Sequence, residues 1–203
     1  MNRRDFLVTG STGAILAAAG TAGAQGSMPM QSPWDWTDEH GPASFLRTDP
    51  DPLENEFEKY PRCPYCGMVR EMWSHTRHLI VYEDDAVDGT CSLHCAAISL
   101  SINMDRGPKT IYAGDAGADA EIKPLADSAG MTYVIDPSKM GTMTRVSKWA
   151  YADPDKAEAA ASAAADARMV GFDDALRLAF ASMAEDTIAI RKRRAERRAR
   201  STQ

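Results

Sequence analysis

The chain has 203 residues, a length that suits one domain with a hydrophobic core. Its formal net charge is −6, although residues 191–200 hold seven basic side chains and one acidic side chain, so the remainder is strongly acidic. An acidic surface repels a phosphate backbone, which argues against nucleic acid as a partner and favours a cationic ligand or a basic protein.

Residues 1–24 have the pattern of an export signal. Arg3 and Arg4 precede a short run rich in alanine and glycine, and an Ala-Gly-Ala motif at residues 22–24 predicts cleavage before Gln25. The paired arginines are typical of the twin-arginine route. The run is too short for a membrane anchor, and the absence of a cysteine near the cleavage site argues against a lipoprotein. We therefore expect a periplasmic protein, in a compartment where unprotected cysteine pairs oxidise.

The segments on either side of the expected domain differ in composition. Residues 25–60 are rich in proline, aspartate and glutamate and have no hydrophobic periodicity, which predicts a poorly ordered linker. The domain is expected over residues 61–190. The basic tail over residues 191–203 suits a solvated helix end that interacts favourably with the helix dipole, or contact with a membrane surface or a partner protein.

The first half of the domain is expected to hold two strands and a helix. Residues 78–83 have the composition of a strand, and residues 84–90 are expected to form the turn after it. A helix is expected over residues 91–104, with Thr90 or Ser92 as its cap. Its apolar positions, Leu93, Ala96, Ala97 and Leu100, fall on one face. Residues 109–114 are expected to form the second strand.

The second half repeats this order of strands and helices. Strands are expected at residues 131–136, around 144–151 and, as a short strand, within 168–174. A helix is expected at 153–167, with Asp153 as cap and Pro154 at its first position. A final helix is expected from about residue 173 to the late 190s. Its core stripe is expected to comprise Leu176, Ala179, Phe180, Met183 and Ile188. The sequence therefore predicts a single α+β domain of two similar halves with a C-terminal helix.

The chain contains only four cysteines, which form two pairs. Cys63 and Cys66 make a C-x2-C motif, and Cys91 and Cys95 make a C-x3-C motif after 24 intervening residues. Four thiolates at such spacing suit a structural zinc ion, which would make the protein a zinc-stabilised interaction module. Cys63-Pro-Tyr-Cys66 also matches the dithiol motif of glutaredoxins, which would make it a thiol-disulfide oxidoreductase. However, a thioredoxin-type domain would place a strand just before this motif and a long helix after it.

A third interpretation is a copper(I) site, and it depends on Met68. Cu(I) is a soft ion that prefers thiolate and thioether ligands, and Cys66-Gly67-Met68 offers both across one glycine. Two further methionines, Met140 and Met143, lie beside a glycine later in the chain. Imidazole also suits copper, so the third ligand stays open among the histidines His75, His78 and His94.

Several of these motifs in this order resemble the NosL family, the copper-delivery accessory proteins of nitrous oxide reductase. The matching elements are Cys66-Gly67-Met68, Cys91-Ser92, TYVIDPSKMGTMT at residues 132–144 and FDDAL at residues 172–176. The resemblance implies a fold of two ββα-like halves and a single Cu(I) ion, with Cys66 and Met68 as ligands and Met143 as a third or nearby ligand. It also implies a non-enzymatic role, in which copper passes in the periplasm to apo-nitrous oxide reductase or another cuproenzyme.

The chain departs from that family in two ways. Members are commonly lipoproteins, whereas this signal is not of that type. Cys91 and Cys95 with His94 between them resemble a TRASH-type metal-binding pattern, which leaves a disulfide, a second metal site or a four-thiolate zinc open. A bond between Cys91 and Cys95 on one helical turn would be strained, so any disulfide is expected to join Cys63 to one of them.

Overall fold

The computed structural model describes residues 35, 39, 41 and 45–201. The export signal expected at residues 1–24 lies outside this range. Among the described helices, none combines the length and apolar character needed to cross a membrane.

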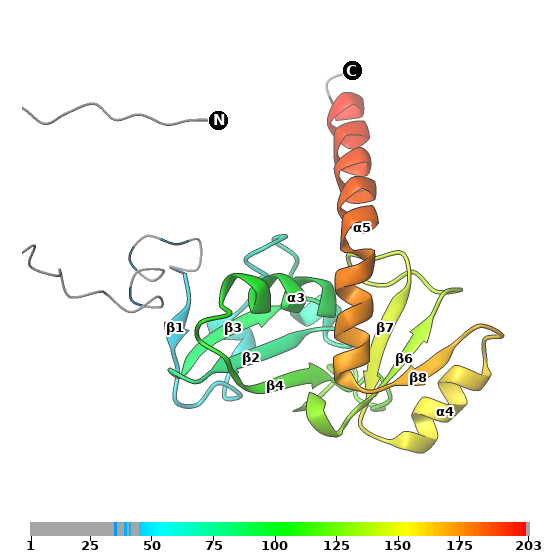
Figure 1. The fold of residues 1–203 in the computed structure, drawn as a ribbon, viewed down its shortest axis with the longest axis horizontal. Coiled ribbons are helices and arrows are strands. Elements are labelled where there is room, and N and C mark those ends of the chain that lie inside the picture. The colour runs from blue at the N-terminus through cyan, green and yellow to red at the C-terminus, as the bar shows by residue number, and fades with distance from the viewer. Residues whose placement is uncertain (1–34, 36–38, 40, 42–44, 202–203) are drawn as a thin grey trace, which may run out of the picture. The chain divides into compact units, whose positions relative to one another are not determined.

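The first half of the fold is an antiparallel sheet covered by one helix (Figure 1). Strands β2 (His78–Tyr82) and β3 (Ala86–Thr90) form a hairpin, helix α3 (Leu93–Ile102) follows, and β4 (Pro108–Gly114) returns beside β2. Two short edge strands, β1 (Arg47–Thr48) and β5 (Leu125–Asp127), complete the order β1-β3-β2-β4-β5.

The second half repeats that arrangement with three strands. Strands β6 (Thr132–Asp136) and β7 (Ser147–Tyr151) pair, helix α4 (Pro154–Ser162) follows, and β8 (Arg168–Val170) returns beside β6. In both halves the first strand is central, and the second and third strands lie on either side of it. Helix α5 (Phe172–Ser201) then ends the described chain. The predicted α+β fold of two ββα-like halves with a C-terminal helix is confirmed.

Local sequence explains where the two internal helices begin. Ser92 caps α3, since its hydroxyl accepts a hydrogen bond of 3.4 Å from the backbone N–H of Cys95. Asp153 caps α4 in the same way, and Pro154 occupies its first turn. The predicted apolar face of α3 packs into the core that both sheets share. The cap therefore fixes Cys95 in the first turn of a helix that is buried against the sheet.

The buried face of α5 differs in part from the expected stripe. Ala175 and Ala179 are buried in the shared core, and Leu176 and Met183 pack against it. Phe180 and Ile188, which were expected on the same stripe, are 42% and 59% exposed. Helix α5 contacts α3 and β6 through a narrow face that includes Ala175 and Ala179. These small residues let α5 approach α3 closely, and the larger side chains of Phe180 and Ile188 lie outside that face.

The expectation of a turn over residues 84–90 was wrong for most of its length. The turn comprises Glu83, Asp84 and Asp85, where Asp85 has a positive φ of 59°, and the following residues are strand β3. This strand is fully buried, although it contains an aspartate and a glycine. A Cβ on Gly89 would lie 2.6 Å from Tyr60 Cβ, so the glycine allows the preceding segment to lie directly on the strand.

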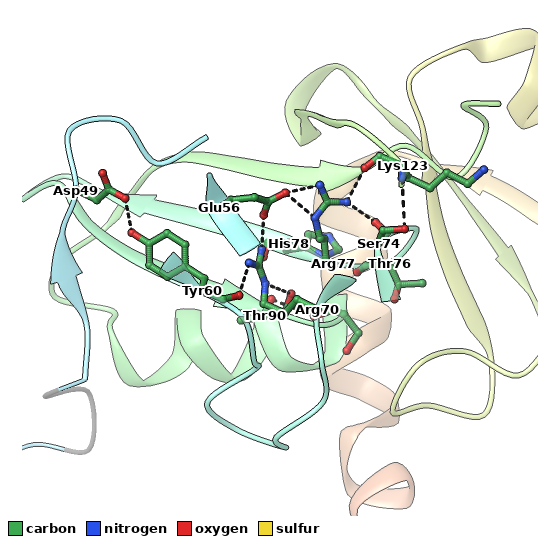
Figure 2. A network of polar contacts seen from close by, with 11 residues as sticks. Asp49, Glu56, Tyr60, Arg70, Ser74, Thr76, Arg77, His78, Thr90 and Lys123 are labelled. Atoms are coloured by element: carbon green, nitrogen blue, oxygen red, sulfur yellow. Dashed lines mark hydrogen bonds and ion pairs between the residues drawn. The ribbon is translucent and has the colours of Figure 1, made fainter. Parts of the chain in front are cut away.

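Residues 45–60, the described second half of the expected linker, are part of the domain. Strand β1 pairs with β3, and the short helix α2 (Glu56–Lys59) places Glu56 in the interior with 7% exposure. The Glu56 carboxylate accepts hydrogen bonds of 2.8 Å from Arg70 Nη2 and from Arg77 Nε (Figure 2). The domain therefore begins before residue 61, because a buried ion pair holds this segment in place.

Candidate metal centre

The first cysteine pair lies in a tight loop between α2 and β2. The backbone N–H of Cys63 donates to the Met68 carbonyl at 2.9 Å, and that of Gly67 donates to the Cys63 carbonyl at 2.8 Å. Gly67 has a φ of +79°, a conformation that a side chain disfavours. These bonds close the loop into a knuckle with the thiols of Cys63 and Cys66 close to each other.

The second pair comes from the junction of β3 and α3. Cys91 directly follows the strand, and Cys95 lies in the capped first turn of the helix. All four Sγ atoms lie within 4.8 Å of one another, with 3.3 Å between Cys66 and Cys91 and 3.8 Å between Cys91 and Cys95. All four are free thiols, so no disulfide joins Cys63 to Cys91 or Cys95. The fold thus gathers all four cysteines into one sulfur cluster.

The four thiols do not ionise alike. Hydrogen bonds from Cys63, Cys91 and Cys95 lower the pKa of Cys66 far below its ordinary value. Hydrogen bonds to Cys63 and Cys66 raise the pKa of Cys91, and the same partners together with Cys91 raise that of Cys95. Cys66 is also half-buried, whereas the other three are buried. The first thiolate therefore forms at the most accessible position of the cluster.

The spacing of the sulfurs suits a soft metal ion. Zinc bound by four thiolates has Zn–S bonds of about 2.3 Å, which puts the sulfurs of a tetrahedron about 3.8 Å apart. The observed separations between 3.3 and 4.8 Å bracket that value. Two or three of the same thiolates would equally satisfy Cu(I). The spacing of the four thiols is therefore compatible with a bound metal ion.

Two thioethers flank the cluster on its half-buried side. Met68 and Met143 both pack against it, together with Trp73 and Tyr65. Met143 comes from the loop between β6 and β7, so the second half of the fold contributes to the centre. The methionine loop, residues 140–144, also contains Met140, which is 74% exposed. Sulfur donors thus extend from the buried cysteines towards solvent.

Met143 occupies an unfavourable backbone conformation, with φ of 64°. A residue with a side chain loses about 1–2 kcal/mol in this region relative to glycine. We expect Met143→Gly to be more stable than Met143→Ala by about 1 kcal/mol, the reverse of the usual order, as measured by urea unfolding. If alanine is the more stable of the two, the loop is not strained at this position.

The predicted ligand His94 lies beside the cluster but faces another partner. Its Nδ1 is 3.7 Å from Asp186 Oδ2, and it is not one of the four residues whose ligand atoms converge. His75 contacts the rings of Trp73 and Trp149, at centroid distances of 6.0 and 5.2 Å. Neither imidazole joins the sulfur cluster.

His78, also considered as a third ligand, is part of the core. Its Nδ1 donates to the Thr76 carbonyl at 3.0 Å, and its Nε2 accepts from the Tyr133 hydroxyl at 3.0 Å. Both ring nitrogens are therefore satisfied in the neutral form. Burial lowers the pKa of His78 to about 4, and the positive charges of the nearby Arg70 and Arg77 act in the same direction.

The buried neutral imidazole of His78 predicts how the stability of the fold changes with pH. Between about pH 6.5 and about pH 4 the unfolded chain binds a proton at His78 that the folded chain does not, so this group destabilises the fold as the pH falls. Burial raises the pKa of Asp88 to about 6, so this group stabilises the fold as the pH falls over part of the same range. Because the two effects oppose each other in the total stability, the pKa of His78 is measured directly. We expect the NMR titration of the His78 ring to have its midpoint near pH 4. A midpoint near the ordinary value would contradict the buried neutral form, and His78→Gln assigns the signal.

One polar group near the centre could not be recognised in the sequence. Tyr65, between the first two cysteines, donates a hydrogen bond to the buried Asp88, which also accepts one from Ser99 on α3. Asp88 lies in the segment that was expected to be a turn, so no pattern marked it. These bonds join the cysteine knuckle to β3 and α3, the elements that carry the second cysteine pair.

The fold and the cluster define an α+β protein of two ββα-like halves with four converging thiols that could hold a metal ion, and the second half places Met143 against them. The sequence model of the NosL family matches residues 54–177, and the chain belongs to this family. A comparison with curated proteins gave no match. The resemblance noted in the sequence is thereby confirmed. The family match begins at residue 54, which agrees with the buried position of Glu56, and ends within α5.

Proposed function

We propose that the protein is a copper-binding accessory protein that holds one Cu(I) ion at the sulfur centre and passes it to a cuproenzyme. Nitrous oxide reductase is the proposed recipient, and the periplasm, reached by the twin-arginine route, is the proposed compartment. The observation that carries the proposal is the convergence of four cysteine thiols, with Met68 and Met143 packed beside them. Family membership supports the same conclusion.

The arrangement of the sulfurs favours a transferable ion. Cu(I) accepts two or three soft ligands, so a cluster of four thiols and two thioethers offers more donors than the ion needs. Spare donors allow one metal–sulfur bond to break as another forms, without a change in the oxidation state of copper. Cys66, the accessible thiol with the lowered pKa, lies two residues before Met68 and suits the side of the cluster from which copper would leave.

A zinc-stabilised module is the second candidate, because the sulfur separations also suit a tetrahedral site. It leaves Met68 and Met143 without a role, since zinc does not favour thioether ligands. A thiol-disulfide oxidoreductase is less well supported. Such enzymes attack through an exposed first cysteine, whereas Cys63 is only 1% exposed.

The test is Cu(I) competition against a chelator, performed anaerobically on the reduced protein. We expect one Cu(I) per chain and an affinity that falls at least about tenfold in Cys66→Ser and in Met68→Leu. Met72→Leu is the matched control, because Met72 is nearby in sequence but 74% exposed. Parent-like binding by both site variants would refute the copper assignment. Stoichiometric zinc that resists displacement by Cu(I) would establish the zinc module instead.

A further inference from the structure

A cavity of about 480 Å³ lies between the methionine loop and the last turns of α5. Met68 and Met143 line one side of it, and both also pack against the cysteine cluster. The other side is formed by α5, through Ile190, Glu196 and four arginines. We call the four arginines the arginine stripe: Arg193, Arg194, Arg197 and Arg200. The cavity is therefore a route along which a second molecule can approach the thioether side of the centre.

The arginine stripe is accessible and has no acidic partner within the described chain. All residues from 191 to 200 are exposed. Arg193, Arg197 and Arg200 recur at helical spacing, so they share one face of α5. Among the described residues, no carboxylate forms an ion pair with any of these three guanidinium groups. Their charge is thus available to an external group.

The sign of this charge excludes a role in attracting the metal. Guanidinium groups beside a cation site repel the incoming ion, so the stripe suits an anionic partner. Insertion of this helix face into a membrane is disfavoured, because only the alanines at positions 195 and 199 are apolar within residues 191–200. A helix that lies in a membrane interface needs a substantial apolar face. A protein surface that carries carboxylates fits the cavity better.

We infer that the cavity docks an acidic segment of the protein that exchanges copper with this one, and that a methionine or cysteine of that segment reaches Met68 and Met143. This inference rests on the proposed function. In the exchange, a sulfur of the segment forms a bond to Cu(I) while a bond to a sulfur of this protein breaks. Copper stays in the +1 state. If the incoming sulfur is a thiol, its proton passes to the thiolate that is released.

Docking is tested separately from copper binding, on the full chain in its reduced, metal-free form. The probe is a synthetic peptide, Asp-Glu-Asp-Met-Asp-Glu-Met, and its control replaces every acid with the corresponding amide. We expect the acidic peptide to bind and the amide peptide not to bind. Binding should weaken steeply as the ionic strength rises from about 0.01 M to about 1 M, because the Debye length falls roughly tenfold.

Two double variants with the same loss of charge locate the docking site. Arg193→Gln with Arg197→Gln removes two cavity arginines, whereas Arg191→Gln with Lys192→Gln removes two charges that do not line the cavity. We expect the first pair to weaken peptide binding about tenfold and the second less than about twofold. The Cu(I) affinity of the isolated protein should be unchanged in both.

Each contrary outcome overturns the inference in a recognisable way. Equal losses in the two variants would mean that only overall charge matters. A fall in Cu(I) affinity confined to Arg193→Gln with Arg197→Gln would mean that the arginines stabilise the thiolates. Binding to phosphatidylglycerol vesicles but not to the acidic peptide would assign the stripe to a membrane. Absence of Cu(I) binding would refute the proposed function, whereas peptide binding can be measured independently of it.

Discussion

Glu56→Gln is expected to lower the free energy of unfolding by about 3–5 kcal/mol, since it leaves two buried guanidinium groups without a counter-charge. The side chains of Arg70 and Arg77 are 0% and 3% exposed, and that of Glu56 is 8% exposed. Burial lowers the pKa of Arg70, and the adjacent Glu56 carboxylate opposes that shift. The interior therefore tolerates these charges only while the carboxylate is present (Figure 2).

The network also explains why the loss should be cooperative. Arg70 donates to the carbonyls of Tyr60 and His78, at 2.8 and 3.2 Å, and Arg77 donates to that of Lys123 at 2.7 Å. One carboxylate thus anchors groups that hold the segment before the knuckle, the central strand and the loop before β5. Its removal loosens all of them together.

Urea unfolding at neutral pH is the appropriate measurement, because urea does not screen charges. Glu58→Gln is the matched control, since Glu58 lies on the same short helix but is exposed. We expect this control to change stability by less than about 0.5 kcal/mol. Equal effects of the two substitutions would show that the buried ion pair does not hold the segment in place.

Asp186→Ala is expected to lower the free energy of unfolding by about 3 kcal/mol. Asp186 is buried on α5, and its carboxylate accepts hydrogen bonds from Ser182 Oγ at 3.0 Å and from the backbone N–H of Arg145 at 3.1 Å. Arg145 immediately follows the methionine loop. The carboxylate therefore joins that loop to the helix that faces it across the cavity.

The same substitution should also affect the proposed metal centre. Without Asp186 the loop that carries Met143 loses its anchor, and we expect the Cu(I) affinity to fall about tenfold, as for other groups that orient ligands. Glu185→Ala is the control, because Glu185 is the adjacent residue and is exposed. If Asp186→Ala changes neither stability nor affinity relative to that control, the loop is positioned by other contacts.

Local patterns in the sequence predict most of the regular elements. The strands at β2, β4 and β6 have runs of β-branched and aromatic residues, and α3 and α4 begin at recognisable caps. Strand β3 could not be predicted, because its aspartate and glycine are typical of a turn. They are tolerated there because Tyr65 and Ser99 donate hydrogen bonds to Asp88 and because Tyr60 and Arg70 pack over Gly89.

The sequence could predict which cysteines belong to the candidate site, but not that all four come together in space. The spacing of the cysteines identified a metal-binding pattern and left several pairings open. That all four converge depends on how the knuckle lies against the start of α3, which is a tertiary contact. The buried position of Glu56 likewise depends on Arg70 and Arg77, which follow it by 14 and 21 residues. Such separations have no local signature.

The contribution of Met143 from the second half gives the centre a further property. A ligand that contacts both halves stabilises only the state in which they are packed together, so occupancy and resistance to opening are thermodynamically linked. Each tenfold excess of free ion over its dissociation constant adds about 1.4 kcal/mol to that resistance. If the centre binds an ion as proposed, the ion-free protein would open more readily and would be the better substrate for proteases. The lifetime of the protein would then report how recently it was loaded.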